Sequence, residues 1–298
     1  MSNCKILGSD CKVYNDDCRN VFPIMENDSI DLIATDPPYG IDGMDENWSH
    51  KKLKSRTKDK SSQTSSIFGL PSTMKFDVRQ GQKLQAFFNE ISPEFYRILK
   101  PGAFLIASAQ PRLYHRMVVA LEDAGFEIRD MLIWEHNGGQ GKAFKMDIRV
   151  MNSNSFSESE KLELIKSMDG RKTPQLRPKF EPIVVAQKPK SGTFFDNWKE
   201  YKVGLIKTLF DEHQQSTVLN YKKPNSRKLH DHMTIKPVEL MERIVEIFSV
   251  EGQLVFDPFL GSGTTAVAAL NKKRKIWGIE KDVETFKKLI GRILHEKR

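Results

Sequence analysis

Short apolar runs, separated by amphipathic stretches, recur along much of the chain. Residues 30–35, 103–108 and 126–134 are apolar enough to be strands buried on both faces, as in parallel sheets. Between these runs, residues 84–99 and residues 111–124 place apolar side chains at helical spacing. Strands that alternate with helices at this spacing predict an α/β fold built on a mostly parallel sheet.

The pattern returns near the C-terminus as a strand, a glycine turn and a helix over residues 254–270. Gly261 and Gly263 allow the backbone to turn tightly beside a ligand, and the start of the helix offers N–H groups without partners. The next strand, residues 275–279, ends at Glu280, whose carboxylate can accept hydrogen bonds from ribose hydroxyls. The turn fits the pattern G-x-G-x-x-G/A, which several nucleotide-binding folds share, and it lacks the Gly-Lys-Ser/Thr of a P-loop. It predicts a nucleoside site without identifying the nucleoside.

Three stretches show neither the apolar runs of buried strands nor the spacing of amphipathic helices. Residues 48–75 are basic and nearly free of apolar side chains, so we expect a mobile loop there. This loop is either a solvated linker or a phosphate-binding element, two alternatives of similar weight. Residues 137–180 are rich in glycine and basic residues, and residues 193–231 mix aromatic side chains with lysines. Those aromatic side chains suit either base stacking or the small core of an inserted subdomain.

Composition narrows the classes of function. The 298 residues are 39% hydrophobic and 29% charged, as in soluble globular proteins, and the formal net charge of +8 favours a polyanionic partner. No apolar run approaches the roughly 20 residues of a membrane span, and the first residues lack the apolar core of a signal peptide. The odd number of cysteines, at positions 4, 11 and 18, indicates reduced thiols in the cytoplasm and does not favour a metal site.

The tetrapeptide Asp36-Pro37-Pro38-Tyr39 directly follows the strand at residues 30–35. An acid at the carboxyl end of a buried strand lies where open α/β sheets bind their ligands. Two prolines fix two backbone angles and remove two N–H donors, so the chain leaves the sheet stiff and extended. An acid, free carbonyl groups and an aromatic ring can then surround one flat polar group. For Asp-Pro-Pro considered alone, a turn without function is the alternative.

The tetrapeptide, together with the segment Asp257-Pro-Phe-Leu-Gly-Ser-Gly-Thr-Thr265, resembles the DNA amino-methyltransferases that use S-adenosylmethionine. The catalytic motif precedes the cofactor motif, an order similar to that of their circularly permuted β class. The resemblance therefore implies a Rossmann-like methyltransferase fold with inserted target-recognition elements. Within the family, Asp at the first motif position is commoner with adenine acceptors and Ser with cytosine acceptors. Adenine N6 is thus favoured over cytosine N4.

Three further segments are similar to the family pattern. They are Asn15–Cys18, in which Asp16 replaces the usual glycine, Arg177–Pro189, and the His-x-x-x-Lys-Pro element at residues 232–237. The matches cover both ends and the middle of the chain. Residues of about 48–75, 137–176 and 190–230 have no counterpart in the pattern, so the DNA recognition sequence does not follow from it.

The resemblance implies transfer of a methyl group to the exocyclic amine of a base flipped out of duplex DNA. Asp36 and the Pro37 carbonyl would accept the N–H bonds of the amine, Pro38 completes the motif, and Tyr39 would stack on the base. The implied cofactor-binding residues are Asp17, Lys236, Asp257, Phe259, Gly261, Ser262, Gly263, Thr264 and Glu280. The residues expected to contact DNA are Lys51, Lys52, Lys54, Arg56, Lys142 and Lys145.

We expect three parts in the chain. Residues 1–136 form the catalytic half, residues 137–231 a target-recognition insertion whose strand 182–186 belongs to the sheet, and residues 232–298 the cofactor-binding half. Duplex DNA is the expected partner; family members are often homodimers, and a restriction enzyme would be a separate chain. Three alternative functions fit the sequence less well. An RNA or protein-glutamine methyltransferase usually has the cofactor motif before the catalytic motif, and a dinucleotide-dependent oxidoreductase would leave residues 36–39 without a role. An inactive DNA-binding relative would not need both sites to be complete.

Overall fold

The computed structural model describes residues 3–38, 79–136, 143–174, 176–208, 215–224 and 235–296. Contacts divide the chain into two compact units, Met1–Glu135 with Phe180–Arg298, which we call the core unit, and His136–Lys179, which we call the helical unit. In the helical unit, α5 (Asp147–Met151) contacts α6 (Glu158–Ser167). None of the helices in the described ranges combines the length and apolar character that a membrane span requires.

The strands of the core unit form one mixed sheet. In the described part of the chain it has nine strands in the order β1-β2-β9-β8-β3-β4-β6-β5-β7. The strands are β1 (Asn3–Ile6), β2 (Cys11–Asn15), β3 (Ile30–Thr35), β4 (Leu99–Ser108), β5 (Glu127–Glu135), β6 (Phe180–Gln187), β7 (Val218–Asn220), β8 (Leu254–Asp257) and β9 (Lys275–Ile279).

Most neighbouring strands are parallel, as predicted. The series β2, β9, β8, β3 and β4 is parallel throughout, and β7 is parallel to β5. The predicted strand at residues 182–186 is β6, and it lies antiparallel between β4 and β5. Two strands that follow one another in the sequence are therefore separated in the sheet by a strand from much later in the chain.

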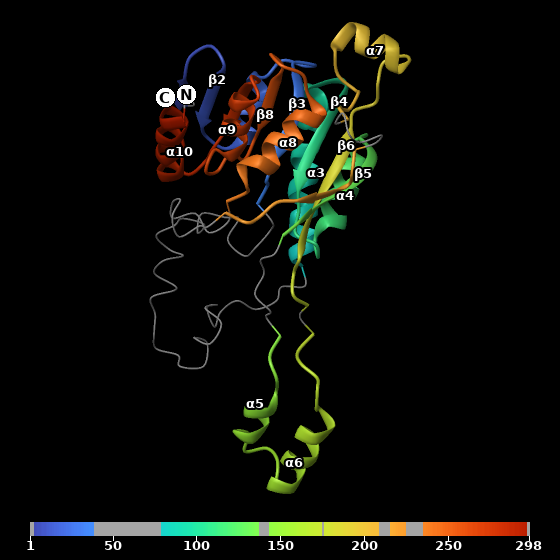
Figure 1. Cartoon of the computed structure of the whole chain (residues 1–298), viewed down its shortest axis with the longest axis vertical. Coiled ribbons are helices and arrows are strands. Elements are labelled where there is room, and N and C mark those ends of the chain that lie inside the picture. Colours follow the sequence, from blue (N-terminus) through green and yellow to red (C-terminus); the bar gives the residue numbers. More distant parts are fainter. Residues whose placement is uncertain are drawn as a thin grey trace. The chain divides into compact units, whose positions relative to one another are not determined.

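Helices of the core unit cover both faces of this sheet (Figure 1). They are α1 (Cys18–Val21), the 3-10 helix η1 (Phe22–Ile24), α3 (Gln80–Ile98), α4 (Tyr114–Asp123), α7 (Phe194–Tyr201), α8 (Val238–Phe248), α9 (Thr264–Asn271) and α10 (Val283–Glu296). Side chains of α1, α3 and α4 pack with Ile33 in one apolar cluster, whereas those of α8, α9 and α10 pack with Leu32 in another. Because successive residues of β3 point to opposite buried faces, the strand is buried along its whole length and is mostly apolar.

The first described helices after β3 and after β8 lie on opposite faces of the sheet. These two strands are parallel neighbours. The helix after β8 is α9, in the layer with α8 and α10, whereas α3, which precedes β4, lies in the other layer. In open α/β sheets, ligands bind at the carboxyl ends of strands where connections diverge in this way. We therefore expect a ligand site at the residues that follow β3 and β8.

Candidate active site

Asp36, Pro37 and Pro38 follow the last residue of β3 directly. All six residues of β3 are buried, so the strand is a rigid support. The Asp36 side chain is 26% exposed, which leaves its carboxylate within reach of a substrate. Tyr39, the fourth residue of the predicted catalytic motif, lies outside the described residues.

Asp257, the last residue of β8, joins the two strand ends. Its Oδ1 accepts hydrogen bonds from Thr35 Oγ1 at 2.6 Å and from the Phe259 backbone N–H at 2.9 Å. Burial raises the pKa of Asp257 to about 6, against the hydrogen bonds from Thr265 and Thr35, which act to lower it. One buried carboxylate thus fastens the turn after β8 to the strand that carries Asp36. Sequence patterns did not single out Thr35, an ordinary β-branched strand residue.

The turn after β8 contains two glycines in the left-handed region, Gly261 with φ +53° and Gly263 with φ +84°. A Cβ atom on Gly263 would lie 2.7 Å from Leu289 Cδ1 of α10, so a larger residue at this position would displace the Leu289 side chain. At Gly261 the nearest atom would be the Phe259 carbonyl oxygen at 3.8 Å. The backbone at Gly261 therefore leaves room for a ligand to approach.

Ser262 and Thr264, predicted to bind the cofactor, lie next to α10. The buried Arg292 donates from Nη1 to the Ser262 carbonyl oxygen at 3.1 Å and to Thr264 Oγ1 at 3.3 Å. These contacts fasten the glycine turn to the helix, and the predicted cofactor role of both residues stays a prediction. Phe259, from the same turn, lies against Phe87 of α3 with 5.9 Å between the ring centroids.

Glu280 follows β9 and hydrogen-bonds to the glycine turn. Its Oε2 accepts from the Gly261 N–H at 2.9 Å, and its Oε1 accepts from the Asp282 N–H at 2.7 Å. Burial raises the pKa of Glu280 to about 7; these two hydrogen bonds oppose the change, and the nearby Asp282 and Asp257 carboxylates add to it. Because two backbone groups hold the carboxylate, its remaining lone pairs keep a fixed direction, as recognition of a ribose diol requires.

Asp17 lies at the end of β2, close to the residues that follow β9. It caps α1 by accepting from the Arg19 N–H, and its Oδ2 pairs with Arg19 at 2.8 Å and with Lys281 at 3.0 Å. These bonds, Arg19 first, hold the pKa of Asp17 well below its usual range. An open hollow of about 620 Å³ adjoins it, lined by Asn15, Asp16, Asp17, Arg19, Asn20, Lys281 and Val283.

Lys236, predicted to lie near the cofactor, contacts the catalytic motif. Its Nζ lies 2.7 Å from Asp36 Oδ2 and 3.0 Å from Glu181 Oε2 of β6. Glu181 had no predicted role, although it belongs to the segment Arg177–Pro189 that resembles the family. A polar residue inside a matched segment was the available signal for it.

Of the residues predicted to contact DNA, only Lys145 lies in the described part of the chain. Lys51, Lys52, Lys54, Arg56 and Lys142 lie outside the described residues. Lys145 is exposed in the helical unit. The roles of all six remain predictions.

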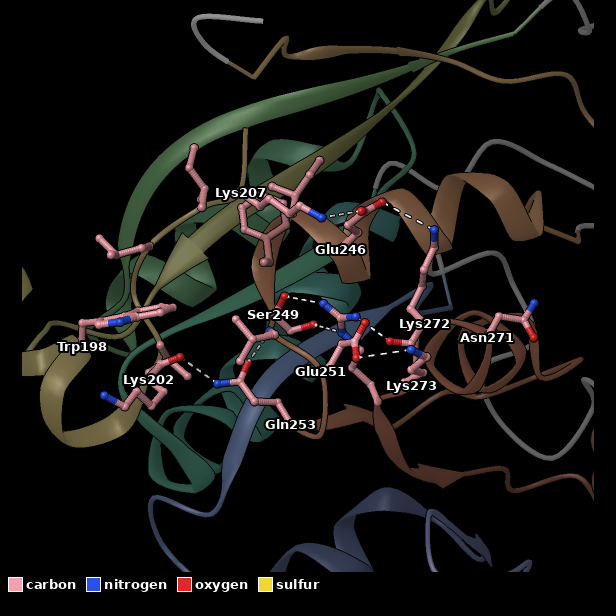
Figure 2. Close-up of a pocket in the computed structure, with 17 residues that line it drawn as sticks. Trp198, Lys202, Lys207, Glu246, Ser249, Glu251, Gln253, Asn271, Lys272 and Lys273 are labelled. Carbon is pink, nitrogen blue, oxygen red and sulfur yellow. Dashed lines mark hydrogen bonds and ion pairs between the residues drawn. The ribbon is translucent and has the colours of Figure 1, made fainter. Parts of the chain in front are cut away.

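A separate cavity of about 590 Å³ lies in the core unit (Figure 2). Its lining includes Trp198, Lys202 and Lys272, and within it Glu246 pairs with Lys207 at 2.7 Å. None of the predicted site residues within the described ranges lines this cavity. The residues after β2, β3, β8 and β9, joined by the hydrogen bonds of Asp257 and Glu280, are therefore the candidate active site.

Comparisons with known proteins show which family the chain is similar to. The DNA methylase family model matches residues 30–290. The Type II methyltransferase M.HindIII of Haemophilus influenzae is 32% identical over 304 aligned positions, which cover 97% of this chain and 96% of that protein.

Two solved structures share the fold. The M1.HpyAVI–SAM complex has a TM-score of 0.56 at 19% identity and covers 95% of this chain and 99% of its own. The PvuII DNA methyltransferase, described as cytosine-N4-specific, has a TM-score of 0.59 at 14% identity and covers 95% of this chain and 86% of its own. Since the family match spans most of the sequence and M.HindIII aligns over nearly its whole length, this chain belongs to the DNA methylase family.

Proposed function

We propose that the protein methylates the N6 amine of adenine at a specific sequence in duplex DNA, with S-adenosylmethionine as the methyl donor. The observation that carries this proposal is the 2.6 Å hydrogen bond from Thr35 Oγ1 to Asp257 Oδ1. It connects the strand that precedes Asp36, a group suited to an amine, to the glycine turn that is held by Glu280, a group suited to a nucleoside. An acceptor site and a donor site on adjacent strand ends are what direct methyl transfer requires.

The chemistry of these residues fits S-adenosylmethionine. The fixed Glu280 carboxylate can accept from ribose hydroxyls, and the open backbone at Gly261 allows close approach. Asp17 lines the open hollow after β2, and the buried Asp257 holds the glycine turn in place, so Asp257 supports the proposed cofactor site without facing the ligand. A protein of the same fold was crystallised as a SAM complex. When bound, S-adenosylmethionine supplies an electrophilic methyl group.

The protein's own groups would act on the target amine. An exocyclic amine is a weak nucleophile because its lone pair is delocalised into the ring. Asp36 and the Pro37 carbonyl would accept hydrogen bonds from its two N–H groups. This arrangement would direct the lone pair of the nitrogen away from the ring plane and toward the methyl group. The N–C bond would form as the bond between the methyl group and the sulfonium sulfur breaks, which leaves a neutral thioether. The nitrogen would become positive, and the Asp36 carboxylate would stabilise this charge until the proton passes to solvent. Flipping the base costs a few kcal/mol of stacking and pairing.

Adenine is the proposed base because Asp, and not Ser, begins the catalytic motif. Cytosine N4 is the alternative, since the PvuII enzyme, which shares the fold, is described as cytosine-N4-specific. Both bases present an exocyclic amine with two N–H bonds, and Asp36 suits either.

Target recognition is proposed for residues 137–231, which include most of the helical unit, with phosphate contacts from Lys142, Lys145 and the basic residues 51–56. Lys145 is exposed, as a phosphate contact requires. The catalytic and cofactor halves, residues 1–136 and 232–298, complete the proposal. A homodimer and a separate restriction enzyme belong to it too, and the Type II relatives support the latter.

The test is methyl transfer from labelled S-adenosylmethionine to unmethylated genomic DNA, followed by separation of the product nucleosides. Label in N6-methyladenine is the expected result, and sequencing of the same DNA then identifies the site. Label in N4-methylcytosine would replace adenine by the alternative base. DNA without label, from protein that binds the cofactor, would contradict the proposed function.

A further inference from the structure

Asp36 is flanked by a cluster of charged and aromatic side chains that the mechanism above does not use. Lys236 Nζ lies between two carboxylates, 2.7 Å from Asp36 Oδ2 and 3.0 Å from Glu181 Oε2. The second oxygen of Glu181 pairs with Lys223 Nζ at 3.2 Å. Both lysine ammonium groups lie over the ring of Trp134, 5.7 Å and 5.4 Å from its centroid.

This cluster is built on the sheet and has little freedom to move. Trp134 of β5 and Glu181 of β6 are direct partners in the antiparallel register. The ring of Trp134 is fixed by a 2.8 Å hydrogen bond from Nε1 to the Tyr221 carbonyl oxygen. Lys236 is 6% exposed and Trp134 is 2% exposed. A buried ammonium group is costly unless it is paired, and here two carboxylates and one ring face surround it.

The charges of the cluster balance. Burial by itself would raise the pKa of Glu181, but the ammonium groups of Lys236 and Lys223 outweigh burial and hold this pKa below its ordinary value. Glu181 is thus an anion at neutral pH, and with Asp36 it makes two carboxylates for two ammonium groups. Lys236 is shared between the two acids and does not belong to Asp36 alone.

We propose that Glu181 is a positioning residue, which holds the Lys236 ammonium against one carboxylate oxygen of Asp36 so that the other oxygen faces the target amine. This inference rests on the proposed function, because it concerns the support of the group that would accept the amine protons. It does not depend on whether the base is adenine or cytosine. The negatively charged Glu181 also attracts the Lys236 ammonium group, which therefore interacts less strongly with Asp36. The Asp36 carboxylate thus remains a strong hydrogen-bond acceptor.

Charge changes in this cluster affect Asp36 in different ways. The charged groups around it are Lys236 before α8, Glu181 of β6, Lys223 after β7 and Asp257 of β8. Removing the Lys236 cation takes away the ammonium group that fixes Oδ2 of Asp36. Removing the Glu181 anion leaves Lys236 without its second carboxylate partner, so that the ammonium group is no longer held in place and interacts with Asp36 alone.

The test measures single-turnover methyl transfer to unmethylated genomic DNA, with enzyme in excess over sites. Lys236→Met should reduce the rate about 100-fold. Glu181→Gln should reduce the rate about tenfold, and it should have little further effect in the Lys236→Met background, because Glu181 acts through Lys236. Lys236→Arg, which keeps the charge, should recover much of the rate lost in Lys236→Met. Cofactor affinity should stay within about threefold of wild type in Glu181→Gln.

The chain offers a matched control in Lys188, which lies elsewhere in the core unit. Its side chain is 12% exposed, its Nζ is 2.7 Å from Asp28 Oδ1, and it lies 4.9 Å from the centroid of the Tyr96 ring. Lys188→Met therefore also removes a paired lysine beside an aromatic ring, and it should keep the wild-type rate. Thermal unfolding of every variant verifies that it is folded.

Loss of the Glu181→Gln effect in the Lys236→Met background is specific to the proposed role, since loss of packing alone would lower the rate in both backgrounds. If Glu181→Gln keeps the wild-type rate, or lowers the rate equally in both backgrounds, Glu181 does not position Lys236 for catalysis. Wild-type protein that transfers no methyl group to DNA would overturn the proposed function along with this inference.

Discussion

Replacing Glu280 with glutamine should make the free energy of unfolding less dependent on pH. In the folded protein, burial raises the pKa of Glu280 from its ordinary 4.5 to about 7. The folded state therefore holds a proton that the unfolded state has lost, and stability falls as pH rises between these two values. The loss begins near the unfolded pKa and is complete above the folded pKa. Glutamine does not titrate, so the variant lacks this contribution.

The expected magnitude follows from the size of the shift. A rise from 4.5 to about 7 corresponds to about 3 kcal/mol. Glu280 retains some exposure, which weakens the effect, so we expect about 2 kcal/mol between pH 5 and pH 8. Glutamine keeps one acceptor oxygen for the two N–H groups of Gly261 and Asp282, a loss of about 1 kcal/mol. That loss is similar at both pH values and cancels in the comparison.

Urea unfolding of wild type and Glu280→Gln at pH 5, 6, 7 and 8 measures this difference. The stability of the variant relative to wild type should increase by about 2 kcal/mol from pH 5 to pH 8. Affinity for S-adenosylmethionine should fall by about 30-fold at pH 8, since a charged acceptor for the ribose is lost. Glu284→Gln, at an exposed position of α10, is the control and should leave both quantities unchanged. Equal pH dependence in wild type and Glu280→Gln would refute the reasoning.

Three further predictions concern other parts of the site. Asp36→Ala should keep cofactor affinity and reduce methyl transfer by at least about 100-fold, because the amine loses its charged acceptor; near-normal turnover would exclude Asp36 from catalysis. Thr35→Val removes the 2.6 Å bond to the buried Asp257 and should lower the free energy of unfolding at pH 7 by about 1–3 kcal/mol, whereas Thr35→Ser should lower it much less; equal urea midpoints for the two variants would contradict this. Neutralising the lysines in residues 51–60 should weaken DNA binding and flatten its dependence on salt, and an unchanged slope would mean that this segment is only a linker.

Local patterns predicted the elements well where one periodicity dominated. The apolar run at 30–35 is β3, residues 84–99 lie mostly in α3, and the strand, glycine turn and helix of 254–270 appear as β8, the turn and α9. These elements depend on alternating or helical burial of nearby residues, which the chain records directly. The motifs predicted to be catalytic and cofactor-binding could be recognised for a similar reason. Each is a continuous segment of the sequence, and its proposed chemistry depends on the side chains within it.

Long-range pairings were not available from such patterns. Nothing local indicates that β6 inserts antiparallel between β4 and β5, or that Thr35 bonds to Asp257 and Lys236 to both Asp36 and Glu181. These contacts join segments far apart in the chain, and they exist because packing of the sheet and its helix layers brings strand ends to one edge. The residues proposed to carry the chemistry could therefore be predicted from the sequence. The packing of the sheet and its helices brings the two predicted motifs together and pairs Lys236 with Asp36.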